Sequence, residues 1–362
     1  MLHSNLLTFQ SQAAETGVKL IDKILKKAAE GYQLQDGEVI QLFRIRKSRD
    51  LASLMKTAFN IMRENRGSVK LTSTVHITNM CQVRPRCGYC GFAAGTSKNG
   101  YYNSFFKTDD EILEAALIIE ESGIPRVSCS GAHGFNGEHA VKAARIVKEN
   151  TSLELLINVG SDLNRSATEK LADYGTDTVC CNLETTNREL FSSVKPGERI
   201  EDRIRVCEMV CAAGIELSSG LLIGLGESYA DRLEHLKFLS KFETLGEIPI
   251  MGFNPYPGTP MEKHPPCPLS EQMKTIAITR ILYPEIRITV PTPTIGPENV
   301  RFSLMAGADN LATVIPDGYP HDVKGVGSPR YGNLRDVLRV VKEMGLRVQL
   351  RPVPSAEGVA LL

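Results

Sequence analysis

The feature that most restricts the fold of this sequence is a regular alternation of short β-rich runs and amphipathic helical runs from Thr74 onward. Such alternation is typical of parallel βα units. The predicted strands are 74–79, 126–129, 154–159, 178–183, 216–223, 248–253, 286–290 and 311–314. The predicted helices between them are 109–122, 138–149, 167–174, 188–191, 200–213, 229–242 and 269–282. Eight strands in this order predict an α/β fold, a complete (β/α)8 barrel of the TIM type.

The two ends of the chain have a different pattern. Apolar residues recur at helical spacing between residues 18 and 62, which predicts helices in front of the barrel. We therefore expect an N-terminal helical cap at 1–70, the barrel at 71–316, and a C-terminal part at 317–362 that packs on the barrel. The C-terminal part is predicted to contain a Gly- and Pro-rich loop (318–332), a helix (333–344), a strand (347–350) and a loosely held tail.

Charge and composition exclude several classes of protein. Lys plus Arg and Asp plus Glu both number 42, so no net field favours binding to nucleic acid or to an anionic membrane. The chain has neither a signal-like start nor an apolar run of about 18 residues. Nine cysteines in such a chain indicate a reducing compartment. We expect a cytoplasmic protein that binds neither nucleic acid nor a membrane.

Three cysteines, Cys81, Cys87 and Cys90, lie in the loop that follows the first predicted strand. In TIM-type barrels the loops at the C-terminal ends of the strands carry the chemistry. Four cysteines would complete a structural zinc site or a fully protein-ligated cluster, whereas three leave one metal position open. A zinc site would need a fourth ligand, and the nearest candidates, Cys129 and His133, are about forty residues away. The spacing favours an iron–sulfur cluster, with zinc as the alternative.

This loop resembles the signature of the radical S-adenosylmethionine (SAM) superfamily. In that superfamily three thiolates hold a [4Fe–4S] cluster, and the amino and carboxylate groups of SAM chelate the fourth iron. The usual spacing is C-x3-C-x2-C with an aromatic residue before the last cysteine, which Cys87-Gly88-Tyr89-Cys90 fits. The first gap has five residues, a departure that resembles the HmdB group, which is associated with making the iron-guanylylpyridinol (FeGP) cofactor of [Fe]-hydrogenase. The resemblance implies Cys81, Cys87 and Cys90 as metal ligands, and a [4Fe–4S] cluster and SAM as cofactors.

Motifs between residues 74 and 314 are similar to the biotin synthase and HydE branch of the superfamily. In that branch the position of Ser130-Gly131 binds the amino group of SAM, and that of Arg203 reaches its carboxylate. Ile223 takes the place of an aliphatic residue beside adenine. The resemblance implies these cofactor-binding residues: Tyr89, Ser130, Gly131, Asn182, Glu184, Arg203, Ile223, Met251 and Asn254. The simpler interpretations are helix capping near Glu184 and a solvated Arg203.

The sequence departs from biotin synthase at a second metal site. Biotin synthase holds a [2Fe–2S] cluster, its sulfur donor, with three cysteines and one arginine. This chain has Cys129 and Arg287 at two of the matching positions but Leu156 and Ser218 at the others, so we do not expect sulfur insertion of the biotin type. The remaining cysteines are assigned mainly to packing: Cys180, Cys181, Cys207, Cys211 and Cys267.

The resemblance implies an enzyme in which the reduced cluster cleaves SAM, and the resulting 5′-deoxyadenosyl radical abstracts hydrogen from a small substrate. Its partners would be that substrate, an external one-electron reductant and, in the HmdB setting, other cofactor-maturation proteins. Two alternatives stay open: an enzyme similar to HydE or methylornithine synthase, and a non-catalytic iron–sulfur scaffold or carrier. No residue is singled out as catalytic, and the barrel-facing positions specify no substrate.

Overall fold

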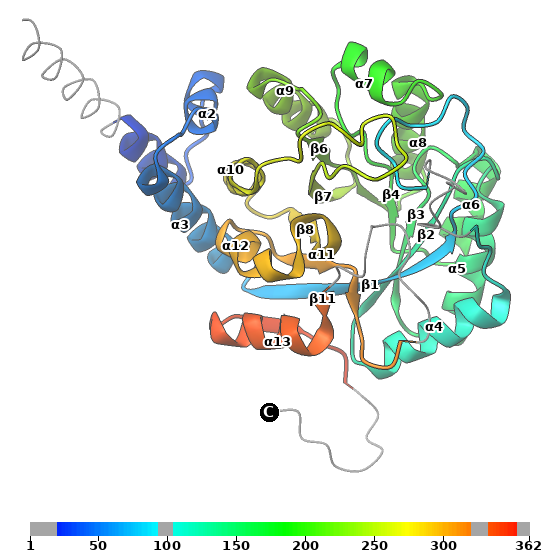
Figure 1. Cartoon of the computed structure of the whole chain (residues 1–362). Helices are drawn as coiled ribbons and strands as arrows, with labels where there is room; N and C mark the ends of the chain where they lie inside the picture. Colours follow the sequence, from blue (N-terminus) through cyan, green and yellow to red (C-terminus); the bar gives the residue numbers. More distant parts are fainter. Residues whose placement is uncertain (1–19, 93–103, 320–331, 353–362) are drawn as a thin grey trace, which may run out of the picture.

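The computed structural model describes residues 20–92, 104–319 and 332–352. Parallel strands close into the predicted eight-stranded barrel, because the first strand pairs with the second on one side and with the last on the other (Figure 1). The barrel strands are β1 (Ser68–Thr78), β2 (Arg126–Gly131), β3 (Glu154–Asn158), β4 (Thr178–Cys180), β5 (Glu216–Ser218), β7 (Leu245–Gly252), β8 (Arg287–Pro291) and β9 (Asn310–Ala312). A short β6 (Leu221–Ile223) follows β5 and pairs with β7.

Helices cover the outside of the barrel between successive strands. They are α4 (Asp109–Glu121), α5 (Glu138–Asn150), α6 (Arg165–Asp173), α7 (Arg188–Val194), α8 (Ile200–Ala212), α9 (Tyr229–Leu239) and α10 (Leu269–Leu282). Local sequence sets their starts: Thr108 and Glu111 form a capping box on α4, and Ser228 and Asp231 form one on α9. The predicted helix positions are confirmed, with ends that differ by a few residues.

The N-terminal helices pack against one side of the barrel. Residues 20–29 are helical, and α2 (Asp36–Phe43) and α3 (Ser48–Asn65) follow. Both α2 and α3 contact α10, and the buried Lys274 of α10 donates a hydrogen bond to the Phe43 carbonyl at 2.9 Å. No helix among residues 20–92, 104–319 and 332–352 combines the length and apolarity that crossing a membrane requires.

The C-terminal region is richer in short elements than the sequence suggests. Two short helices, α11 (Thr292–Ile295) and α12 (Val300–Met305), separate β8 from β9 and were not predicted. Beyond the barrel, β10 (Val314–Ile315) pairs with β11 (Gly332–Asn333), and α13 (Leu334–Glu343) leads to β12 (Arg347–Gln349). Most of the predicted loop at 318–332, and most of the tail, lie outside the described residues.

Strand β1 begins at Ser68, six residues before the predicted start, and its first residues pair with β12. The early part was missed because Lys70 and Thr72 interrupt the apolar pattern. Both are buried, since successive residues of a strand face opposite sides and the interior of this barrel is polar. The apolar core lies instead between the outward faces of the strands and the helices, where Val69 and Leu71 are fully buried.

Charged residues fill the N-terminal end of the barrel. Arg126 on β2 and Arg287 on β8 both donate to Glu247 on β7, at 2.6 and 3.1 Å. Arg287 also binds Glu216 at 2.7 Å, and Lys70 pairs with Glu154. Burial alone would raise the pKa of Glu247, but Arg126 and Arg287 outweigh it and lower that pKa to about 2. This ion-pair layer closes the floor of the barrel and leaves the opposite mouth for a ligand.

Candidate active site

The loop with the three cysteines is attached to the C-terminal mouth of the barrel by backbone hydrogen bonds from three neighbouring loops. The bonds are Gln82 N to His133 O (2.8 Å), Gly88 N to Val194 O (2.7 Å) and Met261 N to Gly88 O (2.9 Å). The nine cysteines form no disulfide among the described residues; Cys87 is buried, while Cys81 and Cys90 are half-buried. The loop therefore follows the first strand at the functional end of a TIM-type barrel, as the sequence predicts.

The described part of the chain has no set of three His, Cys, Asp or Glu side chains that converge on a single metal ion. Cys129, a candidate fourth ligand for zinc, alternates with the inward-facing Ser128 and Ser130 and packs in the outer core. A structural zinc site needs ligands that all lie within about 2.3 Å of one ion, whereas in a cubane cluster each thiolate binds a different iron atom.

Two charged residues that the sequence did not single out, Lys195 and Glu198, lie beside Cys87. The Cys87 thiol donates to Glu198 Oε1 at 3.5 Å, and Lys195 Nζ donates to Cys87 Sγ at 3.5 Å and to Glu198 Oε1 at 3.0 Å. Burial raises the pKa of the Cys87 thiol to about 12, opposed by Lys195. Only a Pro-Gly turn between Lys195 and Glu198 marks this segment in the sequence, and such turns are common in loops.

Arg203, predicted to bind a carboxylate of the cofactor, is buried on α8 next to this group. Its Nη2 donates to Glu198 Oε2 at 2.8 Å, and its Nη1 donates to the Asn182 carbonyl. Burial would raise the pKa of Glu198, but Arg203 and Lys195 outweigh it and hold that pKa well below the ordinary value. A ligand carboxylate at Arg203 would therefore share the guanidinium with Glu198.

A cavity of about 290 Å³ lies beside Cys90 at the mouth of the barrel. Its walls come from the cysteine loop and from the ends of strands on the far side of the barrel. It brings together five of the nine predicted cofactor-binding residues with one predicted metal ligand: Tyr89, Asn182, Glu184, Met251 and Asn254, with Cys90. These residues come from three different parts of the chain and meet in one place, because the carboxyl ends of parallel strands share one end of the barrel.

Three of the residues that line this cavity each have a buried polar atom that, within the described residues, has no hydrogen-bond partner: Tyr89 Oη, Asn182 Oδ1 and Glu184 Oε2. Buried polar groups in folded proteins nearly always have partners, so three such atoms on residues around one cavity point to a ligand. A carboxylate and an amide oxygen accept hydrogen bonds, which suits hydroxyl or ammonium groups. These acceptors therefore fit the ribose hydroxyl and amino groups of the predicted cofactor.

The backbone at Glu184 adopts a strained conformation. Its φ is +66°, in the left-handed region that residues other than glycine rarely occupy. Neighbouring backbone hydrogen bonds hold it there, from Glu184 N to Gly220 O (3.2 Å) and from Leu222 N to Glu184 O (3.0 Å). Such strain concentrates at functional sites, and here it is found at a residue that lines the cavity.

Ile223 does not line the cavity. Its side chain packs in the outer core, whereas the neighbouring Leu222 belongs to a small apolar cluster at the mouth and lines the cavity. Successive residues of β6 face opposite sides, so Leu222 is the one that a ligand in this cavity would touch. The predicted role of Ile223 beside adenine stays a prediction.

Ser130 and Gly131 end β2 close to the mouth but are not among the cavity-lining residues. Ser130 is in register with His76 on β1 and with Asn158 on β3, and Asn158 does line the cavity. An added Cβ at Gly131 would meet Val159 at 3.5 Å, which is ordinary contact, so the structure gives no steric reason for glycine there. The predicted role of both residues stays a prediction.

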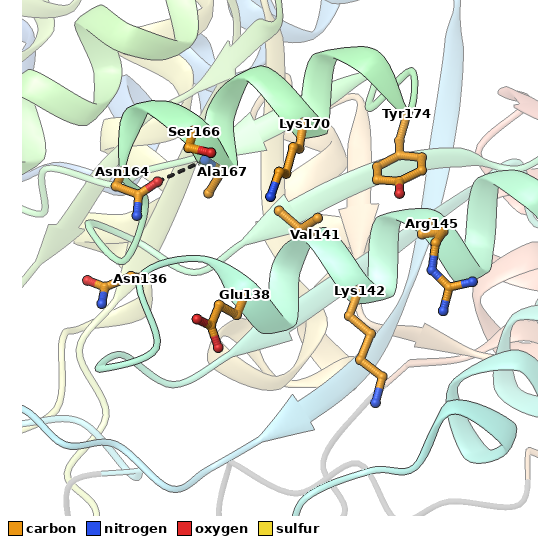
Figure 2. A pocket seen from close by; sticks show the side chains of 10 residues that line it. All are labelled: Asn136, Glu138, Val141, Lys142, Arg145, Asn164, Ser166, Ala167, Lys170 and Tyr174. Carbon is orange, nitrogen blue, oxygen red and sulfur yellow. Dashed lines mark hydrogen bonds between the residues drawn. The ribbon is translucent and has the colours of Figure 1, made fainter.

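Two of the hollows that are larger than this cavity lie elsewhere on the molecule. Figure 2 shows one of about 400 Å³ on the outer surface, where polar side chains of α5 and α6 such as Lys142 and Lys170 line the space between the helices. Another, of about 670 Å³, is apolar and is lined by α3, α10 and α12. Neither contains a predicted site residue or a cysteine.

The positions that match the second metal site of biotin synthase are not arranged as ligands. Cys129 faces the outer core, and Arg287 is bound to Glu216 and Glu247 in the barrel floor. Ser218 donates to Glu247 at 3.4 Å.

Comparisons with known proteins agree with this description. Residues 75–239 match the family described as the radical SAM superfamily, and residues 249–314 match the biotin and thiamin synthesis associated domain. An uncharacterized protein of Methanocaldococcus jannaschii is 56% identical over 317 residues, which cover 88% of this chain and 84% of that protein. Biotin synthase of Acinetobacter calcoaceticus is 31% identical over 257 residues, 66% of this chain and 75% of the enzyme.

Among solved structures, methylornithine synthase (PylB) superposes with a TM-score of 0.81. The two chains are 20% identical, and the match covers 90% of this chain and 97% of that structure. This likeness shows the fold alone.

Proposed function

Since this chain is a member of the radical SAM superfamily and a radical SAM enzyme, with an iron–sulfur cluster and SAM as cofactors, we propose that Cys81, Cys87 and Cys90 hold a [4Fe–4S] cluster. We also propose that the cavity beside Cys90 binds SAM. The observation that carries the second proposal is that three residues lining that cavity, Tyr89, Asn182 and Glu184, each have a buried polar atom without a partner among the described residues. When bound, the two cofactors supply reductive cleavage of SAM to a 5′-deoxyadenosyl radical for hydrogen abstraction.

The residues of the cavity have separate tasks in this proposal. Glu184 and Asn182 accept hydrogen bonds from hydroxyl or ammonium groups, and their burial strengthens these bonds by excluding water. Tyr89, Leu222 and Met251 form apolar walls of the kind that hold an aromatic ring. Asn254 is oriented by its own hydrogen bond to the Thr294 carbonyl at 2.8 Å, which leaves its side-chain oxygen as an acceptor.

We propose a place in biosynthesis of the FeGP cofactor, as in the HmdB group, with a small molecule as substrate. This proposal is supported by the five-residue gap between Cys81 and Cys87. The turn after α7 packs closely against the loop that carries the extra residues. An added Cβ at Gly197 would lie 2.3 Å from the Pro85 carbonyl oxygen, so this turn needs glycine to accommodate the longer loop. An external one-electron reductant and other maturation proteins are the proposed partners.

Anaerobic reconstitution with iron and sulfide, followed by reduction in the presence of SAM, tests the enzyme proposal. The wild-type protein is expected to take up a cluster and to form 5′-deoxyadenosine, and Cys87→Ala is expected to lose both. Cys207→Ala is the matched control, because Cys207 is an equally buried thiol on α8 outside the cysteine loop. A protein that holds the cluster but releases no 5′-deoxyadenosine would be a scaffold or carrier.

The pathway proposal needs its own test. Deletion of the gene in an organism that makes [Fe]-hydrogenase is expected to leave that hydrogenase without its cofactor, as judged by the infrared bands of the iron ligands. Normal cofactor in the deletion strain would refute the pathway proposal and leave the enzyme proposal intact.

A further inference from the structure

Lys195 is a buried cation that contacts both a carboxylate and a cysteine sulfur at the cysteine loop. Its side chain is only 5% exposed, and its ammonium lies 3.0 Å from Glu198 and 3.5 Å from Cys87 Sγ. It also lies 5.2 Å from the centre of the Tyr89 ring, over its face. A lysine is rarely buried unless it is paired, so three convergent partners indicate a position that the fold maintains.

The segment that carries Lys195 is built against the cysteine loop. Val194 accepts a backbone hydrogen bond from Gly88 at 2.7 Å, and Gly197 packs directly on Pro85. These contacts lie on both sides of Lys195, so the backbone on which the ammonium is mounted follows the loop that carries Cys87. The distance between the ammonium and the sulfur is therefore set by two backbone contacts as well as by the side chain.

We propose that Lys195 is a positioning residue that raises the reduction potential of the cluster by donating its charged N–H to the Cys87 thiolate. The inference rests on the proposed function, since it requires Cys87 to bind iron. No sequence motif assigned a role to Lys195. The same ammonium contacts both the Cys87 sulfur and the Glu198 carboxylate, which lie 3.5 Å from each other, and so offsets the negative charge beside the sulfur.

The sign of the effect follows from electrostatics. Reduction adds an electron to the cluster, so a nearby fixed positive charge stabilises the reduced state more than the oxidised state. Hydrogen bonds to the cluster sulfurs and the local net charge set the potentials of iron–sulfur proteins in this way. The effect is strong only where water is excluded, and both Lys195 and Cys87 are buried.

A purely structural role is the alternative, and the chain contains a matched pair for separating the two. Lys274 on α10 is also a buried lysine, 3% exposed, that pairs with a glutamate three residues away, Glu271, at 2.7 Å. It too lies 5.2 Å from the centre of a tyrosine ring, that of Tyr229. Lys274 contacts α2 and α9 rather than the cysteine loop. Replacing it therefore also removes a buried, paired lysine, but at a site away from the cysteine loop.

The experiment compares Lys195→Met with Lys274→Met and the wild type, each full-length and reconstituted anaerobically. Iron content and thermal midpoint are measured first, and the midpoint potential is then obtained by redox titration of the EPR signal of the reduced cluster, without SAM. We expect a more negative potential in Lys195→Met, an unchanged potential in Lys274→Met, and restoration of the wild-type potential in Lys195→Arg, which keeps the charge.

An iron-loaded Lys195→Met protein with the wild-type potential would overturn the proposal, and so would an equal shift in Lys274→Met. If Lys195→Met takes up no iron, Lys195→Gln replaces it, with the same expected shift. An electrostatic role would be supported if both neutral variants of Lys195 lost iron while Lys195→Arg and Lys274→Met kept it. Loss of iron in Lys195→Arg as well would refute that role. A wild-type protein that takes up no cluster would instead refute the proposed function.

Discussion

The ion-pair layer at the barrel floor leads to a quantitative prediction for Glu247. Its side chain is 2% exposed, and it accepts from Arg126, which is 1% exposed, and from Arg287. In Glu247→Gln the side chain keeps its size but loses its charge, which leaves Arg126 buried without a counter-charge. Removing one partner of a buried ion pair costs about 3–5 kcal/mol of unfolding free energy.

The pKa of Glu247 leads to a similar magnitude by an independent route. The ordinary pKa of 4.5 falls to about 2 in the folded protein, since Arg126 and Arg287 outweigh the opposing effect of burial. This difference corresponds to about 3 kcal/mol of stability. Because the folded-state pKa is the lower one, this stability is fully present above pH 4.5 and is lost as the pH falls toward 2. At pH 4 about 1 kcal/mol of it is already lost.

Urea unfolding of the wild type and Glu247→Gln at pH 7, and then at steps down to pH 4, tests both numbers. We expect a difference of about 3 kcal/mol at pH 7 that shrinks below pH 4.5. Glu216→Gln is the control: it removes a partner of the same Arg287, but Glu216 is 32% exposed, and we expect a cost below about 1 kcal/mol. A Glu247→Gln variant within 1 kcal/mol of the wild type at pH 7, or an equal cost for Glu216→Gln, would refute the reasoning.

Three further predictions concern the mouth of the barrel. Glu184→Gln should weaken SAM binding to the reconstituted protein by about tenfold, since it removes the charge from a buried acceptor, and equilibrium dialysis with an unchanged affinity would contradict this. Leu222→Ala should lower the affinity for SAM, because Leu222 lines the cavity. Ile223→Ala should lower the unfolding free energy by about 2–5 kcal/mol and leave the affinity for SAM unchanged. The reverse pattern would identify Ile223 as the residue that contacts SAM. Gly197→Ala should reduce the iron that reconstitution incorporates, because its Cβ would lie 2.3 Å from the Pro85 carbonyl oxygen. Gly37→Ala, where nothing lies within 4 Å of an added Cβ, should leave the iron content unchanged. Equal iron content in both variants would count against the close packing of the turn on the loop.

Local patterns were sufficient for the architecture of this chain. Eight β-rich runs alternating with amphipathic helices can bury their apolar residues on both sides of a parallel sheet only by closing or stacking, and the structure has the closed form. The cysteine loop was located by the same logic, because a loop that follows a parallel strand lies at the end of the barrel where chemistry occurs. Both conclusions needed only contacts between neighbours in sequence and the periodicity of the strands.

Inward polar residues were the main source of error in the strand assignments. Lys70 and Thr72 hid the first half of β1, because an ion-pair layer inside a barrel makes a buried strand look exposed in the sequence. At β6 the motif identifies the strand, but the twist and register of its neighbours decide which of two adjacent apolar residues, Leu222 or Ile223, faces the cavity.

The sequence by itself determined the barrel, the superfamily and the loop that carries Cys81, Cys87 and Cys90, since each depends on spacing along the chain. Only the tertiary structure decided which residues surround that loop. Lys195 and Glu198 lie more than one hundred residues from Cys87 in sequence, and their contact with it depends on how the loop after β1 packs against the turn after α7. No local propensity encodes a distance between two loops, because it results from the closure of the whole barrel.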